Sequence, residues 1–224
     1  MIVLANTKGG VGKSTLAVHL AVWLYEQGFP TALLDTDRQR SSSLWVSEAE
    51  PGITVRTADT PEQCLTEARD LLDYHDFVIG DGQAALDDLS RTMLVLADVA
   101  LLPITPSILD IRSVQQATGI LRIAQQLNGG RPEGRLVLNR MKTRDRISQE
   151  LMKTSPELGV SVGATHVRDL QAFRDSAQQG TVVMRMGKKG TEATFDICCL
   201  FDALFRNEIE KRRERHGTGE DGRA

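Results

Sequence analysis

Short apolar runs alternate with longer amphipathic segments along most of this chain. The runs are rich in valine, isoleucine and leucine, and glycine, proline, asparagine or aspartate bounds most of them. This alternation is typical of buried parallel strands that are joined by crossover helices. We expect strands at residues 2–5, 31–34, 77–79, 99–102 and 136–138, and a further extended segment at 160–167.

The segments between these runs have the spacing of helices. Leu16, Leu20 and Leu24 share one face of a predicted helix that ends before Gly28. Residues 60–63 form a capping box with proline at the first helical position. The final helix carries Phe195, Cys199, Leu204 and Phe205, which we expect to pack on the sheet. The predicted helices are 14–27, 60–72, 107–128, 146–159 and 192–213.

One domain accounts for this pattern. No internal repeat or interdomain linker interrupts it, and 224 residues can bury most of their apolar surface in a single core. The sequence therefore predicts an α/β fold over residues 1–215, with a doubly wound, mostly parallel sheet and helices on both faces. We expect the polar residues 216–224 to form a disordered tail.

Composition narrows the class of protein. The chain is 41% hydrophobic and 25% charged, as soluble globular proteins are. It has no apolar run of about 18 residues and no signal peptide ahead of the first strand, so we expect a cytoplasmic protein without a membrane span. Cys64, Cys198 and Cys199 match no metal or disulfide spacing, and we expect reduced thiols.

Charge is unevenly distributed, although the net charge is only −3. Residues 1–130 hold 9 basic and 16 acidic residues, whereas residues 131–224 hold 18 basic and 14 acidic residues. The basic C-terminal part is compatible with an anionic partner. A solvated charged tail would produce the same distribution, so both interpretations stand.

The strongest chemical signal is a glycine-rich octet between the first strand and the first helix. Its glycines let backbone N–H groups turn towards phosphate oxygens, and the helix N-terminus adds partial positive charge. In this pattern Lys13 neutralises the β- and γ-phosphates, Ser14 gives its hydroxyl to Mg²⁺ and Thr15 reaches the α-phosphate. The octet predicts binding of ATP with Mg²⁺. Its members are Lys8, Gly9, Gly10, Val11, Gly12, Lys13, Ser14 and Thr15.

The octet has Thr7 where the general phosphate-loop pattern has glycine, and it adds Lys8. It resembles the deviant Walker A motif of the ParA/MinD superfamily of P-loop ATPases. Other segments resemble that family's motifs in the same order, and the resemblance covers about residues 1–205. Within the family the chain most resembles small plasmid-partition ParA proteins, which lack an N-terminal DNA-binding domain. These segments are 33–39 (Asp-x-Asp), 76–81 (Walker B), 102–110 (proline-bearing switch) and 136–140 (strand ending in asparagine).

Three aspartates gain roles from position and charge once the motifs are aligned. Asp35 and Asp81 each end a predicted strand beside the loop, where they can hold Mg²⁺ through its water molecules. Asp37 lies on the same side of an extended chain as Asp35, and is our candidate to orient the attacking water. A turn or capping residue is the alternative for Asp37. Lys8, Lys13 and Asp37 form the predicted catalytic set.

Other roles come from the resemblance alone. Lys8 resembles the signature lysine that reaches the ATP of the partner subunit, with an ordinary exposed lysine as the alternative. Asn139 is similar to the asparagine that reads adenine, with a simple turn residue as the alternative. Arg168 matches a family arginine that follows the next strand, and nucleotide, DNA and surface roles all remain open for it.

The chain also departs from the family pattern. Arg38 replaces the usual proline, and Gly82-Gln83 follows Asp81 where the family commonly has x-Pro-Pro. Neither change removes a residue needed for hydrolysis, so ATPase activity is still implied. The sequence gives no physical account of Arg38.

The resemblance implies an ATPase switch that forms a homodimer on ATP and positions plasmid or chromosomal DNA. Its dimer would bind the nucleoid without sequence preference, through basic residues on phosphates. A small centromere-binding protein, ParB-like or ParG-like, would stimulate hydrolysis. Each basic cluster is also compatible with a solvated face. The candidate DNA contacts are Arg140, Lys142, Arg144, Arg146, Arg185, Lys188, Lys189, Lys211, Arg212, Arg213 and Arg215.

Two other functions stay open. A membrane-surface positioning ATPase like MinD would need an amphipathic C-terminal helix, but the apolar residues of the last helix stop near Ile209. A metabolic enzyme of the dethiobiotin synthetase or cobyrinate amidation type would need a substrate pocket, for which little chain remains. The cysteines exclude an electron-transfer iron protein. The sequence names neither the cargo nor the partner.

Overall fold

A single parallel sheet forms the centre of the molecule. The computed structural model describes residues 1–83, 87–105, 108–141 and 160–217. The strands are β1 (Ile2–Leu4), β2 (Thr31–Asp35), β3 (Thr54–Thr57), β4 (Phe77–Asp81), β5 (Val99–Ile104), β6 (Glu133–Met141) and β7 (Ser161–Arg168). They lie in the order β3-β2-β4-β1-β5-β6-β7. Every pairing in this sheet is parallel, as the sequence predicts.

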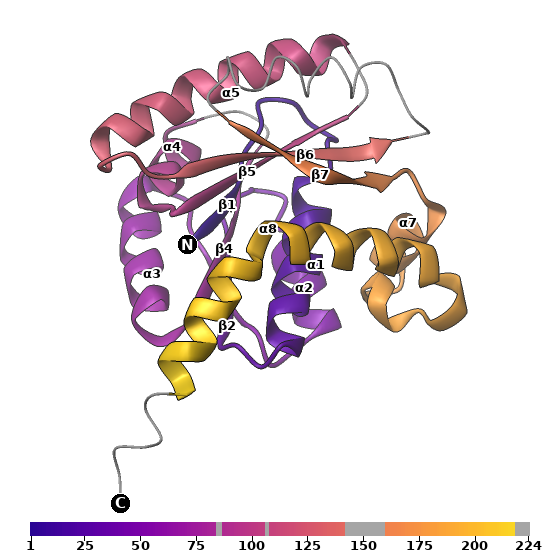
Figure 1. Ribbon diagram of the computed structural model, residues 1–224. Helices are drawn as coiled ribbons and strands as arrows, with labels where there is room; N and C mark the ends of the chain where they lie inside the picture. Colours follow the sequence, from indigo (N-terminus) through magenta and orange to yellow (C-terminus); the bar gives the residue numbers. More distant parts are fainter. Residues whose placement is uncertain (84–86, 106–107, 142–159, 218–224) are drawn as a thin grey trace, which may run out of the picture.

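Helices cover both faces of the sheet (Figure 1). They are α1 (Lys13–Glu26), α2 (Ser41–Ala49), α3 (Pro61–Tyr74), α4 (Asp88–Leu96), α5 (Ile108–Leu127), α7 (Gln171–Gln178) and α8 (Thr191–Gly217), with short 3-10 turns η1 (Val183–Arg185) and η2 (Gly187–Lys189). One layer contains α1, α2 and α8, and the other contains α3, α4 and α5. The doubly wound α/β fold is therefore confirmed.

The alternation of side chains along each strand divides the core into two halves. On β1, Ile2 and Leu4 contact the α1 and α8 side, whereas Val3 contacts the α3 and α5 side. Both faces are buried, which explains why the strands appear as continuous apolar runs and not as alternating patterns.

Helix α1 is buried on all sides from Leu16 to Leu24, where every residue is at most 4% exposed. The sequence predicted a single apolar face along Leu16, Leu20 and Leu24. The difference arises because the sheet, α2 and α8 all pack around this helix. The phosphate-loop helix is thereby fixed in the middle of the fold.

Several elements differ from expectation. Strand β3 and helices α2, α4 and α7 were not predicted, and α8 continues to Gly217, past the expected domain end at 215. Phe195 is 66% exposed and does not pack on the sheet, because it lies about half a helical turn from the buried Ile197. All three cysteines are free thiols. The predicted helix at 146–159 and residues 218–224 of the predicted tail lie outside the described residues.

The sheet order brings the predicted site residues to one edge. Because the strands are parallel, their carboxyl ends meet there, as ligand sites of open α/β sheets require. Strand β1 lies between β4 and β5 and leads into the phosphate loop. Asp35 and Asp81 are direct neighbours in the β2–β4 register, and Asp81 also pairs with Leu4 of β1.

Candidate active site

The phosphate loop has a backbone that only glycine adopts without strain at two positions. Gly10 and Gly12 have φ values of 75° and 95°. A Cβ atom on Gly12 would lie 2.2 Å from the side-chain nitrogen of Asn139. Gly12 is also the N-cap of α1, and no side chain caps this helix. The first N–H groups of α1 therefore face the loop, where they fit a phosphate group.

A cavity of about 550 Å³ opens in front of this loop, a volume typical of small-ligand sites. The sequence missed one wall of it, formed by Trp45 of α2 together with Leu170, Phe173 and Ala177 in and beside α7. Those residues were missed because neither helix was predicted. The predicted nucleotide and catalytic residues that line the cavity are Gly9, Gly10, Gly12, Lys13, Ser14, Thr15, Asp37 and Asn139, and Arg140, predicted as a DNA contact, also lines it.

Lys13 is a buried ammonium group at the base of the cavity, with 7% of the residue exposed. Burial lowers the pKa of Lys13, and the negative charges of Asp81 and then Asp37 oppose that shift. A buried cation at this place favours a polyanionic ligand. Water no longer solvates the ammonium group, and the negative charge of the ligand stabilises it instead.

Asp81 is the buried carboxylate beside Lys13. No hydrogen bond from a described residue reaches either of its side-chain oxygens. Burial raises the pKa of Asp81 to about 6, against the lowering influence of the neighbouring Ser14 and Ser42 hydroxyls, while Asp35 raises it further. An orphaned carboxylate next to Ser14 fits Mg²⁺, which would supply the missing charge and polarise a phosphate oxygen.

The described residues contain no group of three or more His, Cys, Asp or Glu side chains that could hold a metal ion by itself. Mg²⁺ in nucleotide sites keeps several water molecules and uses one or two protein ligands together with substrate phosphates. Ser14 and Asp81 are the residues that would hold it.

Asp35 has a different environment from Asp81, although the sequence assigned both to the metal. Its Oδ1 atom accepts the N–H of Asp37 at 2.9 Å, and its Oδ2 atom accepts the N–H of Ser43 at 3.0 Å. Asp35 thus shapes the loop between β2 and α2. Asp81 is the better-placed metal ligand of the two.

Asp37 lines the cavity from this same loop. Its Oδ1 atom accepts the N–H of Gln39 at 2.9 Å, which is the local turn contact that the alternative interpretation expects. The turn contact and the exposure to the cavity coexist. The geometry therefore leaves Asp37 able to orient a water molecule.

Asn139 braces the phosphate loop. It is 5% exposed, and its side-chain amide donates to the carbonyl of Val11 at 2.7 Å. The same side chain lines the cavity. The strand was predicted to end at Asn139, but β6 continues to Met141, and the contact of Asn139 with the loop was not foreseen.

Comparison with known proteins agrees with this geometry. The family described as the CobQ/CobB/MinD/ParA nucleotide binding domain matches residues 2–183. The chain belongs to this family. It is therefore an ATPase of the ParA/MinD type, which confirms the predicted activity and nucleotide.

Relatives of this family cover most of the chain. The "Maintenance of carboxysome distribution protein A" of Halothiobacillus neapolitanus is 30% identical over 203 residues, which are 88% of this chain and 92% of that protein. "Protein ParA" of Rhizobium radiobacter is 32% identical over 115 residues, 49% of this chain and 50% of that protein.

Solved structures show the same fold. An ATP complex of a McdA variant from Cyanothece has a TM-score of 0.72 at 15% identity, covering 91% of this chain and 95% of that one. A putative plasmid partition protein from Borrelia burgdorferi bound to AMPPNP has a TM-score of 0.70 at 14% identity, covering 92% and 98%.

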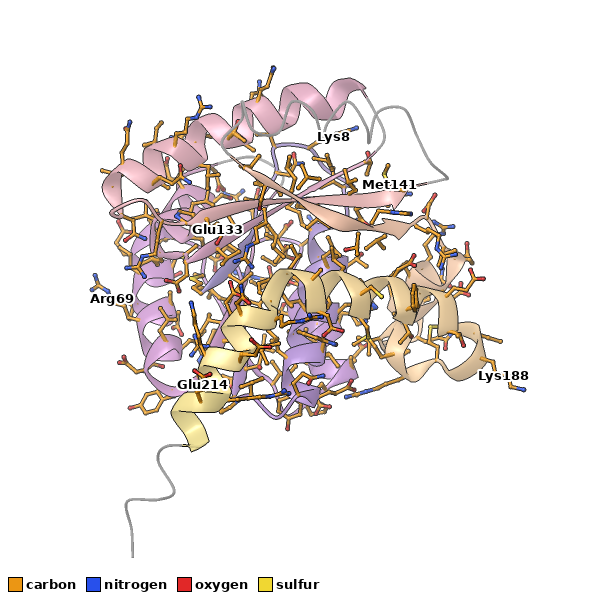
Figure 2. All side chains as sticks on the ribbon, in the orientation of Figure 1. Lys8, Arg69, Glu133, Met141, Lys188 and Glu214 are labelled. Atoms are coloured by element: carbon orange, nitrogen blue, oxygen red, sulfur yellow. The ribbon has the colours of Figure 1, made fainter. Side chains whose placement is uncertain are left out.

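Lys8, the residue that distinguishes the deviant Walker A motif of the family, lines a different hollow from Lys13. Within the described residues it does not line the 550 Å³ cavity, and it borders a second hollow of about 380 Å³ together with Thr105 and Arg140. Its backbone N–H donates to the Asn6 side chain at 2.9 Å. Figure 2 shows the labelled Lys8 near α5.

Arg140 and Arg168, two of the arginines that line the cavity, have structural partners. Arg140 donates to the carbonyl of Gly10 at 3.1 Å and pairs with Asp169 at 3.4 Å, so it lies against the phosphate loop. Arg168 makes a forked contact with Asp196 at 2.9 to 3.2 Å, which ties the end of β7 to α8. This contact gives Arg168 a role that the sequence left open.

The other basic candidates fall into two groups. Arg185 pairs with Glu26 and Glu50, Arg212 stacks on Phe77, and Arg213 lies over Phe29. Their guanidinium groups are engaged within the fold. In contrast, Lys188, Lys189 and Lys211 are exposed, and Figure 2 shows Lys188 at the edge of the molecule. Lys142, Arg144, Arg146 and the side chain of Arg215 lie outside the described residues.

Proposed function

We propose that the chain is a Mg²⁺-dependent ATPase switch that dimerises on ATP and positions DNA as a nucleoid-associated cytoplasmic protein. The dimer binds DNA without sequence preference, and a centromere-binding partner stimulates hydrolysis. The placement of Lys8 is the observation that carries the proposal. Lys8 does not line the 550 Å³ cavity of its own chain, and it borders an adjoining hollow that shares Gly9 and Gly10 of the phosphate loop with that cavity.

An ATP molecule held by Lys13 would leave negative charge at the mouth of the cavity. Two such sites that face each other repel unless positive charge lies between them. Lys8 supplies that charge at the rim of the phosphate loop. Dimerisation that depends on ATP follows from this arrangement.

The DNA surface rests on the exposed lysines Lys188, Lys189 and Lys211. They belong to the C-terminal part, which carries the excess of basic residues. One copy offers few such charges. Pairing doubles them, and because each phosphate contact releases counterions, DNA affinity rises steeply with the number of contacts.

A membrane surface is less well supported as the target. The large apolar residues of α8, including Leu200, Phe201 and Phe205, are buried in the core, with the exception of the exposed Phe195, so this helix presents no continuous apolar face to lipid. Among the described residues, no helix is both long and apolar enough to cross a bilayer.

A protein assembly is a second candidate for the cargo. Two relatives that match over most of their length, from Halothiobacillus neapolitanus and Gloeobacter kilaueensis, are named for maintenance of carboxysome distribution. If the cargo is a protein assembly, the proposed ATP switch and DNA-binding surface stay the same, and the partner protein links the switch to that assembly.

Sedimentation with plasmid DNA tests the DNA surface. Binding is expected with Mg·ATP at low salt, not without nucleotide, and it is lost by roughly 0.3 M salt because counterions then compete. Charge reversal of Lys188 and Lys189 to Glu weakens it, whereas the matched Arg69→Glu on α3 leaves it intact, since Arg69 is exposed on the acidic half. ATP turnover without DNA stays the same in both variants. Binding to anionic vesicles in place of DNA would refute the proposal.

A further inference from the structure

Arg40 lies at the end of the loop between β2 and α2, in a conformation that arginine rarely adopts. Its φ of 54° is left-handed, and within the described residues Arg140 is the other non-glycine residue with positive φ. Such a conformation costs about 1–3 kcal/mol and persists where the surrounding contacts over-determine it. Glycine would adopt this conformation without that cost. We therefore expect the Arg40 side chain to make contacts that offset the strain.

The contacts of Arg40 join three segments. Its backbone N–H donates to the carbonyl of Asp37 at 2.9 Å, which closes a turn that begins at Asp37. Its Nη1 atom donates to the carbonyl of Asp35, at the end of β2, at 2.6 Å. Its Nη2 atom pairs with Asp59, which follows β3. The carbonyl of Arg40 accepts the Ser43 hydroxyl at 2.9 Å, in the first turn of α2.

We propose that Arg40 and Asp59 form a positioning pair that holds the Asp37 turn in the orientation needed for hydrolysis. This inference rests on the role proposed above for Asp37. The turn is tied to β2 by the guanidinium group, and the guanidinium group is fixed in direction by the Asp59 carboxylate. Asp37 therefore lines the cavity from a loop that Arg40 fixes at two points, the carbonyl of Asp35 and the carboxylate of Asp59.

Arg40 acts through the loop and not on the nucleotide. Among the described residues, Asp37 and Ser41 on either side of it line the cavity, but Arg40 does not. Its side chain is 23% exposed and points to Asp59, which is 70% exposed. An ion pair so open to solvent contributes at most about 1 kcal/mol to stability, so its removal leaves the fold intact.

The decisive variant is Asp59→Ala, because it keeps the charge of Arg40 and removes only its anchor. We expect kcat to fall about tenfold, since small displacements of a catalytic group are costly, with unchanged affinity for a fluorescent ATP analogue. Arg40→Gln should show at least the same loss, and Arg40→Lys a smaller one, because it keeps the charge without the fork. The double variant Arg40→Gln/Asp59→Ala should be no slower than Arg40→Gln alone.

Glu67→Gln is the matched control, because it removes a partly exposed carboxylate of α3 that pairs with Arg56 of β3 at 3.5 Å. It should keep wild-type kcat. Wild-type kcat in Asp59→Ala, effects that multiply in the double variant, or a parallel loss of ATP affinity would overturn the positioning role.

Asp37→Asn, measured in the same assay, separates this inference from the role on which it rests. Wild-type turnover in Asp37→Asn would refute the role of Asp37 itself. Loss of turnover in Asp37→Asn together with wild-type kcat in the Arg40 and Asp59 variants would refute the positioning pair alone.

Discussion

Lys13 combines deep burial with a charge that the fold only partly balances. Burial lowers the pKa of Lys13 and the Asp81 carboxylate raises it. The carboxylate therefore stabilises the charged form of the buried ammonium group. We expect Lys13→Ala to lower ATP affinity at least about a hundredfold in a fluorescent-ATP titration, since a charge-assisted phosphate contact in a buried site is lost. Lys189→Ala, an exposed lysine far along the chain, serves as control. Unchanged affinity in Lys13→Ala would refute the phosphate-loop assignment.

His19 is a buried residue whose hydrogen bonds define its protonation. Its Nε2 atom accepts the N–H of Val183 at 3.1 Å, so Nδ1 must carry the proton that it donates to the carbonyl of Thr15 at 2.7 Å. Trp45 and Phe173 contact the ring edge-on, each with a centroid separation of 5.5 Å. His19 thereby links the phosphate-loop helix to the cavity wall and to η1.

The stability of the protein should depend on pH through His19. Burial lowers the pKa of His19 to about 4, although the bond to Thr15 opposes the shift. The unfolded chain takes up a proton near pH 6.5 and the folded chain does not, so stability is present above pH 6.5 and is lost as pH falls towards 4. We expect a loss of about 3 kcal/mol in the free energy of unfolding.

Urea unfolding at pH 7 and pH 4 measures this loss. The His19→Gln variant carries no titrating ring, so it should lose about 3 kcal/mol less than wild type over the same range. Parallel losses in the two proteins would show that other groups dominate the acid sensitivity.

At the scale of elements, Arg185 joins η1 to the ends of two helices. It pairs with Glu26 of α1 at 2.8 Å and with Glu50 after α2 at 2.6 Å, and it donates to the carbonyl of Ala49. Arg185→Gln should lower stability by about 1–2 kcal/mol, because several charge-assisted contacts are lost at a partly exposed site. Lys188→Gln, three residues further on and exposed, should change it by less than about 0.5 kcal/mol. Equal melting temperatures for both variants would contradict this role.

The elements show which features a local pattern reveals. The apolar runs of β1, β2, β4, β5 and β6 were predicted because both of their faces are buried. Strand β3 is half exposed and has no apolar run, and α2 begins with three serines. Two of these, Ser42 and Ser43, are buried by contacts with distant segments, which no short window of sequence contains.

The same limit applies to the site. The phosphate loop could be proposed from the sequence alone, because its chemistry lies in eight consecutive residues. The pairing of Arg185 with Glu26, and of Arg168 with Asp196, joins residues far apart in sequence. The basic clusters could therefore be counted from the sequence. The sequence could not show which of their residues pair within the fold and which are exposed to solvent. The contact of Asn139 with Val11 was hidden for the same reason.

At the scale of the whole molecule, Lys8 should govern assembly and not nucleotide capture. Its position outside the cavity of its own chain leaves Lys13 to bind phosphate. We expect Lys8→Ala to bind ATP with near wild-type affinity and to remain monomeric, because facing phosphates then repel without a cation between them. Sedimentation velocity with and without ATP measures the change. A variant that dimerises as wild type does would show that Lys8 is a surface residue.

The strand order also has a consequence for synthesis on the ribosome. Strand β1 leaves the ribosome before its two neighbours, since Ile2 pairs with Ile79 of β4 and with Val99 of β5. The central strand and the mostly apolar α1 must therefore wait for about a hundred residues of further chain before β1 has both of its neighbours. Non-local parallel pairing is slow, and exposed apolar segments associate wrongly in the meantime. The nascent chain is thus a natural client for chaperones that shield its first thirty residues until β5 has emerged.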